Sequence, residues 1–263
     1  MLQNDSEQHQ VIAAERRAIL LKNLNKKGYI QVTELAKMMN ISPMTIRRDL
    51  SVLEQEGLCI RKRGGAIRST ESVTLELPYE IKRNSHIAEK KQIAEAAIKL
   101  IDHGSTIILD SGSTTFAIAH LLAHKRITVV TNDLQIATKL ATNPNINLIC
   151  TGGMARANVF SLQGSMVESL IRSLKVDITF LGADAIHDDG AVSNVSFEEA
   201  MIKQAMIKAA SKVVLVADSS KFYKTGFTRV CYLSDLDMII TDSAISKEKL
   251  DLLASSSIEA TIA

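Results

Sequence analysis

The sequence predicts an α/β protein in two parts: a small basic N-terminal domain of short helices and a hairpin, then a larger domain built on a parallel sheet. At 263 residues the chain is long enough for one or two domains. Positive charge gathers near the N-terminus, because residues 11–70 carry a net charge of +7 and residues 71–263 carry −3. After Gly104, six short apolar runs alternate with helical patterns, as in parallel sheets covered on both faces.

The composition argues against a disulfide framework, a metal site and a membrane span. The three cysteines lie far apart without a CxxC pair, and the six histidines form no ligand-spaced cluster with them. No segment reaches the roughly 18 apolar residues that a membrane span needs. Residues 1–10 are polar and lack the apolar core of a signal peptide. We therefore expect a reduced, cytoplasmic protein with no cofactor, no metal and no membrane partner, whose first ten residues are disordered.

Two short helices are predicted before residue 40. Residues 15–25 place Ile19, Leu20 and Leu24 on one apolar stripe, which ends at two lysines and Gly28. After a short strand around Ile30, a second helix is expected from Thr33, as its N-cap, through Met39, with Leu35, Ala36 and Met39 facing inward.

The third helix carries the clearest local signals. Ser42 is a strong N-cap residue, and Pro43 suits the first helical position because its missing N–H is no loss there. Ile46, Leu50 and Leu53 recur at steps of four and three and so form one buried stripe. Two short helices joined by a tight turn have the helix-turn-helix layout, in which the second helix enters the major groove of DNA.

The opposite face of this helix carries Thr45, Arg47, Arg48 and Ser51. Two adjacent guanidinium groups beside small hydroxyls suit the reading of phosphates and guanine edges. The alternative is an ordinary solvated charged face.

A basic hairpin is expected directly after the third helix. That helix ends near Gly57, a short strand covers residues 58–60, and Gly64-Gly65 permits a tight turn within a cationic segment. Such a wing would contact phosphate or the minor groove beside the recognition helix and add salt-dependent affinity. The predicted contacts with double-stranded DNA are Ser42, Met44, Thr45, Arg47, Arg48, Ser51, Arg61, Arg63, Gly64 and Gly65.

The predicted domains are residues 11–68, a linker at 69–84 with a short helix near Tyr79, and residues 85–263. Ser85 is the expected N-cap of a helix that runs from Ile87 to Ile101. The predicted strands are Thr106–Leu109, Ile127–Val130, Ile146–Cys150, Ile178–Leu181, Val213–Val216 and Met238–Ile240. Ligands of such sheets bind beyond the carboxyl ends of the strands.

The first of these ends runs into Asp110-Ser-Gly-Ser-Thr-Thr115 and then into a helix. Free N–H groups, the positive end of a helix and several hydroxyls would converge there, which favours phosphate. No GK[ST] follows, so nucleotide hydrolysis is unsupported. The alternative is an ordinary capped strand-to-helix turn.

Polar or glycine residues follow the other strands too. Glu199 and Lys203 lie four apart and could pair on a helix surface, and Asp218 and Lys221 could hold a ligand or pair with each other. The predicted contacts with an anionic effector are Asp110, Ser111, Gly112, Ser113, Thr114, Thr115, Thr131, Asn132, Gly152, Gly153, Asp184, Glu199, Lys203, Asp218 and Lys221.

Two groups of motifs resemble one family of bacterial transcription regulators. The stretch IQVTELAKMMNISPMTIRRDLSVLEQEGLCIRKRGGA, within residues 16–66, is similar to the winged helix-turn-helix of the DeoR family. The segments ILDSGSTT, VVTN, TGG, FLGADAI and DSSKF, within residues 87–242, resemble the sensor domain of that family, whose fold is similar to ribose-5-phosphate isomerase and glucosamine-6-phosphate deaminase. The sequences FLGADAI and DSSKF most resemble those of regulators of amino-sugar and hexitol use.

The resemblance implies a repressor of a carbohydrate catabolic operon that a phosphorylated sugar releases from its operator. It implies that Asp110, Ser113, Thr114 and Thr115 form a phosphate loop and that Asp218 and Lys221 contact the effector. A homodimer or homotetramer is expected to place paired winged helices on operator half-sites, and activation by effector stays open.

An isomerase-like enzyme is the alternative function, with Asp184 or Glu199 as its base. We expect no enzyme, because isomerases of this fold carry a lysine-and-glycine-rich turn after the GAD segment, where this chain has Ile186-His-Asp-Asp-Gly190. A constitutive architectural DNA binder would leave the anion loop without a purpose.

Overall fold

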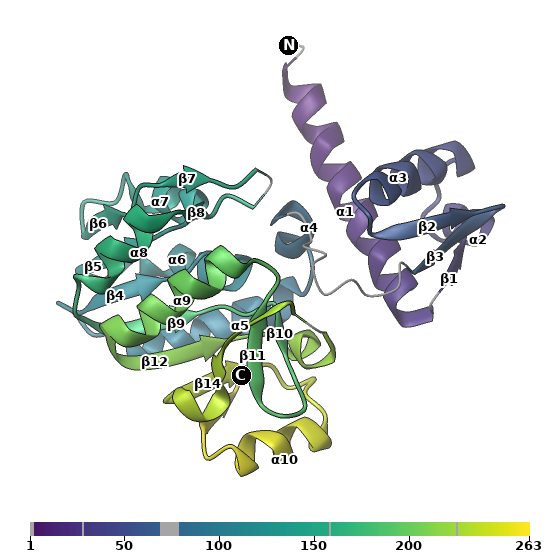
Figure 1. The fold of residues 1–263 in the computed structure, drawn as a ribbon. Coiled ribbons are helices and arrows are strands. Elements are labelled where there is room, and N and C mark those ends of the chain that lie inside the picture. The colour runs from purple at the N-terminus through teal and green to yellow at the C-terminus, as the bar shows by residue number, and fades with distance from the viewer. Residues whose placement is uncertain (1–2, 28, 69–78, 158, 225) are drawn as a thin grey trace. The chain divides into compact units, whose positions relative to one another are not determined.

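The chain folds into two compact units, Met1–Ser85 and His86–Ala263. The computed structural model describes residues 3–27, 29–68, 79–157, 159–224 and 226–263. In Figure 1 the first unit is purple to blue, and the second runs from blue through teal and green to yellow. No helix in the described residues is long and apolar enough to cross a membrane.

The N-terminal unit contains helices and a small antiparallel sheet. Its elements are α1 (Gln3–Lys27), β1 (Tyr29–Gln31), α2 (Val32–Met38), α3 (Pro43–Gln55), β2 (Cys59–Lys62), β3 (Gly65–Arg68) and α4 (Tyr79–Arg83). The strands pair in the order β1-β3-β2, so the β2–β3 hairpin forms a wing that also pairs with the strand before α2. Leu20, Leu24, Ile46, Leu50 and Leu53 are at most 1% exposed and form the centre of its core. The predicted winged helix-turn-helix is confirmed.

Two boundary predictions in this unit are wrong. Helix α1 begins at Gln3, so residues 3–10 are helical and not disordered; this stretch contains neither proline nor glycine to stop the helix. The N-cap of α2 is Gln31, without a side-chain bond, and Thr33 lies inside the helix. The pairing of β1 with β3 fixes the chain up to Gln31, and Val32 then turns its apolar side chain into the core.

The second unit is built on a seven-stranded parallel sheet (Figure 1). The order is β15-β14-β12-β9-β4-β5-β6, and every neighbouring pair is parallel. The strands are β4 (Thr106–Leu109), β5 (Ile127–Thr131), β6 (Ile146–Cys150), β9 (Val176–Leu181), β12 (Ala210–Val216), β14 (Met238–Thr241) and β15 (Glu259–Ile262). The six predicted strands are confirmed. The seventh, β15, lies at an edge and is mostly exposed, so its sequence lacks the continuous apolar run that identified the others.

Helices cover both faces of this sheet. Helices α5 (Ile87–Ala97), α6 (Ser113–Leu121) and α7 (Leu134–Leu140) share one apolar core with alternate residues of the strands, such as Ile107 and Leu109. On the other face α8 (Ser165–Arg172), α9 (Phe197–Ala209) and α10 (Lys247–Ser255) pack with Ile108 and its counterparts. The short helices are η1 (Ile98–Leu100), η2 (Leu122–His124), η3 (Ser219–Tyr223) and η4 (Leu233–Asp235).

Helix α5 does not begin as predicted. Its N-cap is His86, in the left-handed region with φ 54°, and no side chain caps the helix. The expectation that Ser85 is the cap is therefore wrong, because the left-handed turn at His86 separates Ser85 from the helix by one residue.

Two small antiparallel sheets were not predicted. One pairs β7 (Met154–Ala155) with β8 (Leu162–Gln163), and the other has the order β10 (Ala185–Ile186), β11 (Ala191–Asn194), β13 (Thr228–Tyr232). The register of β11 with β13 shifts between Val192 and Ser193. Their strands are too short or too polar to give a clear period-2 pattern.

The chain reverses its direction across the sheet between β4 and β9. From β4 it proceeds outward to β5 and β6, while β9, β12, β14 and β15 lie on the other side. In open parallel sheets this switch point is where a crevice forms at the carboxyl ends of the strands. Asp110 directly follows β4 and Gly182 directly follows β9, so both lie at the switch point.

Candidate functional site

The N-terminus of helix α3 has the predicted cap. The Ser42 hydroxyl accepts a hydrogen bond from the backbone N–H of Thr45 at 3.1 Å and lies 2.9 Å from the Thr45 hydroxyl. Pro43 occupies the first helical position. This cap fixes the helix start, so the residues that follow it have defined directions.

The outward face of α3 is cationic and solvent-exposed. Met44 is 68% exposed, and Arg47 and Arg48 are also exposed, with no ion pair among the contacts of the described residues. Thr45 is half-buried beside them. Arginines that hold no acid are available to phosphates or base edges, and a methionine can contact a thymine methyl group.

Ser51 and Arg61, two other predicted DNA contacts, bond to each other. The Arg61 guanidinium donates to the Ser51 hydroxyl at 2.7 Å, and the Arg61 backbone N–H donates to the Glu54 carboxylate at 2.9 Å. Ser51 in turn donates to the Arg47 carbonyl at 3.0 Å. These contacts tie the wing to the C-terminal half of α3, so Arg61 holds the wing in place in this structure.

The two wing glycines have different roles. Gly64 lies in the turn with φ 85°, a conformation that glycine adopts without strain. At Gly65 a Cβ atom would lie 2.0 Å from the Ile30 carbonyl oxygen, so only glycine lets β3 pack against β1. Arg63 is exposed at the tip between the strands.

The sequence interpretation missed an ion pair behind this surface. Asp49 of α3 is 4% exposed and accepts two hydrogen bonds from the Arg16 guanidinium of α1, at 2.7 and 3.1 Å. The pair joins α3 to α1 on the buried side of α3, away from the exposed arginines. The sequence did contain a signal for this pair, because Asp49 lies on the same helix face as the apolar core residues.

In the second unit, Asp110 is buried at the sheet switch point. Its carboxylate forms an ion pair with the Lys203 ammonium of α9 and accepts the backbone N–H groups of Ser111 and Gly182, each at 2.8 Å. Lys203 also donates to the Gly182 carbonyl at 3.1 Å. Burial opposes the charged form of Lys203, but the Asp110 and Glu199 carboxylates raise its pKa, so the ammonium stays charged.

Asp133, which the sequence interpretation did not select, anchors the same loop. One carboxylate oxygen accepts the backbone N–H groups of Gln135 and Ile136 and so caps α7. The other accepts the Ser111 hydroxyl at 2.8 Å and the Gly112 N–H at 3.3 Å. These hydrogen bonds lower the pKa of Asp133, but burial outweighs them, so the pKa lies above its usual value. An aspartate directly before an apolar helix was the missed N-cap signal.

Neighbouring groups complete the anchoring. Asn132 accepts the Ser111 N–H at 3.1 Å, and the buried Thr131 hydroxyl accepts the Asp133 N–H at 3.1 Å. Thr115 donates its hydroxyl to the Gly112 carbonyl at 2.8 Å. The loop that leads into α6 is therefore fixed by the side chains of Asn132 and Asp133, which follow β5, and by the Gly182 backbone, which follows β9.

The first turn of α6 provides the remaining donors of this loop. The backbone N–H groups of Ser113, Thr114 and Thr115 have no partner within the helix, as in any first helical turn. The Ser113 and Thr114 hydroxyls lie on the same turn. The positive end of the helix and these donors lie where the sequence predicts an anion seat.

Glu199 is at the centre of a second polar cluster and does not pair with Lys203. It is 7% exposed and accepts bonds from the Arg156 guanidinium at 2.8 Å, the Ser161 hydroxyl at 2.5 Å and the Asn194 amide at 2.8 Å. The alternative of a surface Glu199–Lys203 pair is wrong, because both side chains are buried and have separate partners. Arg156, Ser161 and Asn194 were missed because they come from short segments whose pairing the sequence does not show.

The other predicted groups are Asp184, whose carboxylate also raises the pKa of Lys203, and the two glycines that follow β6. Asp184 accepts the Val195 N–H at 3.2 Å. Gly153 is required by packing, because a Cβ there would lie 2.6 Å from both the Gln163 carbonyl and the Val167 side chain, whereas Gly152 lies in a turn with φ 70°.

Asp218 and Lys221 lie at the end of β12. Burial alone would raise the pKa of Asp218, but Lys221, Ser220, Lys90 and His86 lower it to about 2. Its carboxylate accepts the Ser220 N–H and hydroxyl, and no direct ion pair joins it to Lys221 among the contacts of the described residues. The side chain of Lys221 is half-buried and is not paired with that carboxylate.

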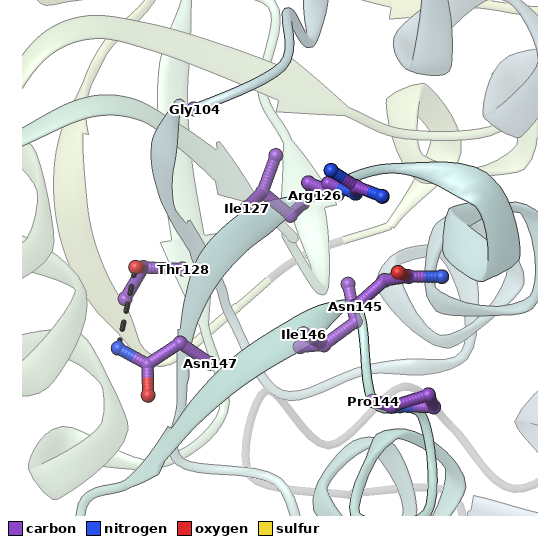
Figure 2. A pocket seen from close by; sticks show the side chains of 8 residues that line it. All are labelled: Gly104, Arg126, Ile127, Thr128, Pro144, Asn145, Ile146 and Asn147. Atoms are coloured by element: carbon purple, nitrogen blue, oxygen red, sulfur yellow. Dashed lines mark hydrogen bonds between the residues drawn. The ribbon is translucent and has the colours of Figure 1, made fainter.

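A hollow of about 480 Å³ lies at the opposite, amino ends of β5 and β6. Arg126, Thr128, Asn145 and Asn147 line it, and Figure 2 shows Asn147 bonded to Thr128. It contains none of the residues predicted to bind the effector.

A winged helix-turn-helix with a cationic helix face, followed by a parallel-sheet α/β domain, is the architecture of a class of DNA-binding regulators. The DeoR-like helix-turn-helix domain matches residues 16–72, and the DeoR C terminal sensor domain matches residues 85–243. The chain belongs to the DeoR family, and the prediction of a DNA-binding transcriptional regulator is confirmed.

Relatives named as transcriptional repressors or regulators match most of the chain. The putative aga operon transcriptional repressor of Escherichia coli O157:H7 is 34% identical over 94% of this chain and 92% of its own length. The glycerol-3-phosphate regulon repressor of Escherichia coli K12 is 31% identical over 87% of this chain and 90% of its own length. GolR, an HTH-type transcriptional regulator of Listeria innocua, is 34% identical over 89% and 92%.

Among solved structures, ribose 5-phosphate isomerase A from Methanocaldococcus jannaschii is similar at 19% identity, with a TM-score of 0.40, over 52% of this chain and 55% of its own. A likeness this distant says nothing about activity.

Proposed function

We propose that this chain represses an operon of carbohydrate use and that a phosphorylated sugar, bound by the second unit, releases it from operator DNA. The names of the relatives support repression, since two are called repressors and one of those controls a glycerol-3-phosphate regulon. The α3 face with Met44, Thr45, Arg47 and Arg48 reads the operator. The wing, with Arg63 at its tip, contacts phosphates.

The observation that carries the effector half of the proposal is the fixed first turn of α6. Asp110 and Asp133 hold the loop from the protein side, so the N–H groups of Ser113–Thr115 need not rearrange to receive an anion. A preorganised set of donors at a helix N-terminus suits a phosphate monoester. Lys221 is half-buried in η3, which follows β12, two strands along the sheet from β4, and in this proposal it adds a cation for the same ligand.

Binding without turnover fits the carboxylates of the site. An isomerase needs a carboxylate that can take a proton from its substrate. Glu199 accepts three hydrogen bonds and Asp184 accepts a backbone N–H, so both nominated bases are engaged with protein donors. We infer a non-enzymatic sensor that works in the cytoplasm, where operator DNA is found, and that binds paired half-sites as a homodimer or homotetramer.

The test combines DNA binding with effector addition. A duplex selected from a random library by the full chain serves as operator, and its affinity is measured by fluorescence anisotropy at physiological salt. Glycerol 3-phosphate, ribose 5-phosphate, galactosamine 6-phosphate and tagatose 6-phosphate are then added singly. We expect at least one of them to weaken operator binding by 5- to 150-fold, the range of ordinary allosteric coupling. A chain whose operator affinity ignores all four, or that turns one over, contradicts the proposal.

A further inference from the structure

Asn194 presents a buried oxygen without a partner beside the polar cluster of Glu199. The residue is 2% exposed at the end of β11. Its amide nitrogen donates to the Glu199 carboxylate at 2.8 Å, and a carboxylate can only accept, so the orientation of the amide group is fixed. The Asn194 Oδ1 oxygen then points away from Glu199 and has no hydrogen-bond partner among the described residues.

Such an acceptor calls for an explanation, because buried polar groups are nearly always hydrogen-bonded and an unpaired one costs free energy. Asn194 also lies close to an irregularity of its sheet. The register of β11 against β13 shifts between Val192 and Ser193, where β13 contains the extra residue Val230. Irregularities of this kind are common next to binding sites.

The cluster around Asn194 is suited to a neutral or cationic donor and not to a second anion. Glu199 already accepts from Arg156, Ser161 and Asn194, so the charge of Arg156 is neutralised. Among the described residues of this cluster, the Asn194 oxygen is an acceptor without a hydrogen-bond partner. The complementary ligand group is a hydroxyl or an amine.

A continuous set of contacts joins this acceptor to the anion seat. Ser161, which donates to Glu199, forms a β-bridge with Asp133, and Asp133 holds the Ser111-Gly112 loop before α6. On the other side of the site, Lys203 lies one turn after Glu199 on α9 and bonds Asp110 of the same loop. One helix therefore anchors both places.

We propose that Asn194 is a specificity-determining residue of the sensor, whose Oδ1 oxygen accepts a hydrogen bond from a hydroxyl or amine at the end of the effector remote from its phosphate. This rests on the proposed function, since the phosphate occupies the first turn of α6. The pair of subsites selects for length: a ligand must reach from the anion seat to Asn194. Pentose and hexose phosphates then bind better than phosphate or a three-carbon phosphate.

The test uses a series of probes of increasing length on the full chain. Binding of inorganic phosphate, glycerol 3-phosphate, ribose 5-phosphate and galactosamine 6-phosphate is measured by titration calorimetry for the wild type and for Asn194→Ala. We expect the substitution to weaken the longest probe roughly tenfold more than inorganic phosphate, the effect of one lost hydrogen bond and an unpaired ligand group. Asn194→Ser, which keeps a smaller acceptor, should recover part of the loss and serves if the alanine variant does not fold.

The matched control is Asn147→Ala, which removes an asparagine from the hollow in Figure 2 at the opposite ends of the strands. It should bind every probe as the wild type does. Equal weakening of all probes by Asn194→Ala, weakening of none, or a larger effect of Asn147→Ala overturns the subsite. If the wild type binds none of the four probes, the anion seat itself is contradicted, and the subsite with it.

Discussion

Replacing Asp110 by asparagine would leave the Lys203 ammonium buried without its carboxylate. The two side chains are 2% and 4% exposed, so water cannot compensate. Among the described residues, the remaining hydrogen-bond partner of the ammonium is the Gly182 carbonyl, and Glu199 and Asp184 act on it only through space. Breaking a buried ion pair on one side costs about 3–5 kcal/mol, mainly from the uncompensated charge. We expect Asp110→Asn to lower the free energy of unfolding of the sensor unit by that amount.

The reverse change should cost less. In Lys203→Met the Asp110 carboxylate keeps the N–H groups of Ser111 and Gly182 as donors, so its charge is partly satisfied. The double variant Asp110→Asn, Lys203→Met contains no buried charge at this position. It should therefore be more stable than Asp110→Asn alone, with an interaction energy of about 2 kcal/mol between the two sites.

Urea unfolding of the full chain followed by circular dichroism measures these differences, because the chain has no tryptophan for fluorescence. Glu168→Gln is a control, since its ion pair with Arg172 lies within one surface helix and contributes little. A cost below about 1 kcal/mol for Asp110→Asn, or strict additivity in the double variant, would refute the account of the pair as charged and mutually required.

Three further changes test separate parts of the molecule. Arg47→Ala should weaken specific operator binding by about 1–3 kcal/mol without changing the melting temperature. The control, Lys22→Ala on α1, should leave operator binding unchanged. Equal gel-shift affinity for both variants would contradict the role of α3. Lys221→Ala should keep operator binding but lose its response to sugar phosphates in the anisotropy assay, and a normal response would place the effector elsewhere. Asp218→Asn should remove about 2 kcal/mol at pH 7, because neighbouring cations hold the pKa of Asp218 at about 2, below its usual 3.8. That stabilisation is present above pH 4 and is lost as the pH falls through 2, so the wild type and the variant should converge in acid; a constant gap would contradict it.

The elements whose burial is regular could be predicted from the sequence. Ser42 capped α3 as expected, and the six strands with continuous apolar runs formed the parallel sheet. Elements that depend on long-range pairing could not be predicted. The edge strand β15 is mostly exposed, and β11 takes its place only through pairing with β10 and β13. The N-caps of α2 and α5 were misplaced because backbone pairing and a left-handed turn at His86 decide where those helices begin.

Within the sites, local motifs identified the segments but not the direction of each side chain. Ser111 and Asp110 lie in the predicted loop, yet both face inward and hold it in place. Arg156 and Ser161 come from other segments and reach Glu199 only in the folded chain. No periodicity within one segment contains that information, because partners 38 or 43 residues apart in sequence are chosen by the tertiary fold.

Both units contain a buried aspartate beside the residues that are proposed to contact a ligand. The presence of this aspartate explains the TIRRDL and DSGSTT motifs better than ligand contacts alone would. In the third helix, Arg47 and Arg48 face solvent while Asp49, the next residue, faces inward and holds α1. In the sensor, Ser113 and Thr114 lie on the first turn of α6, while Asp110 is buried and forms an ion pair with Lys203 of α9. Each short motif therefore combines a proposed contact surface with a buried acid that fixes its geometry. Replacing an anchoring acid should displace the contact residues and should therefore lower both stability and activity. Replacing a contact residue should lower activity and leave stability unchanged.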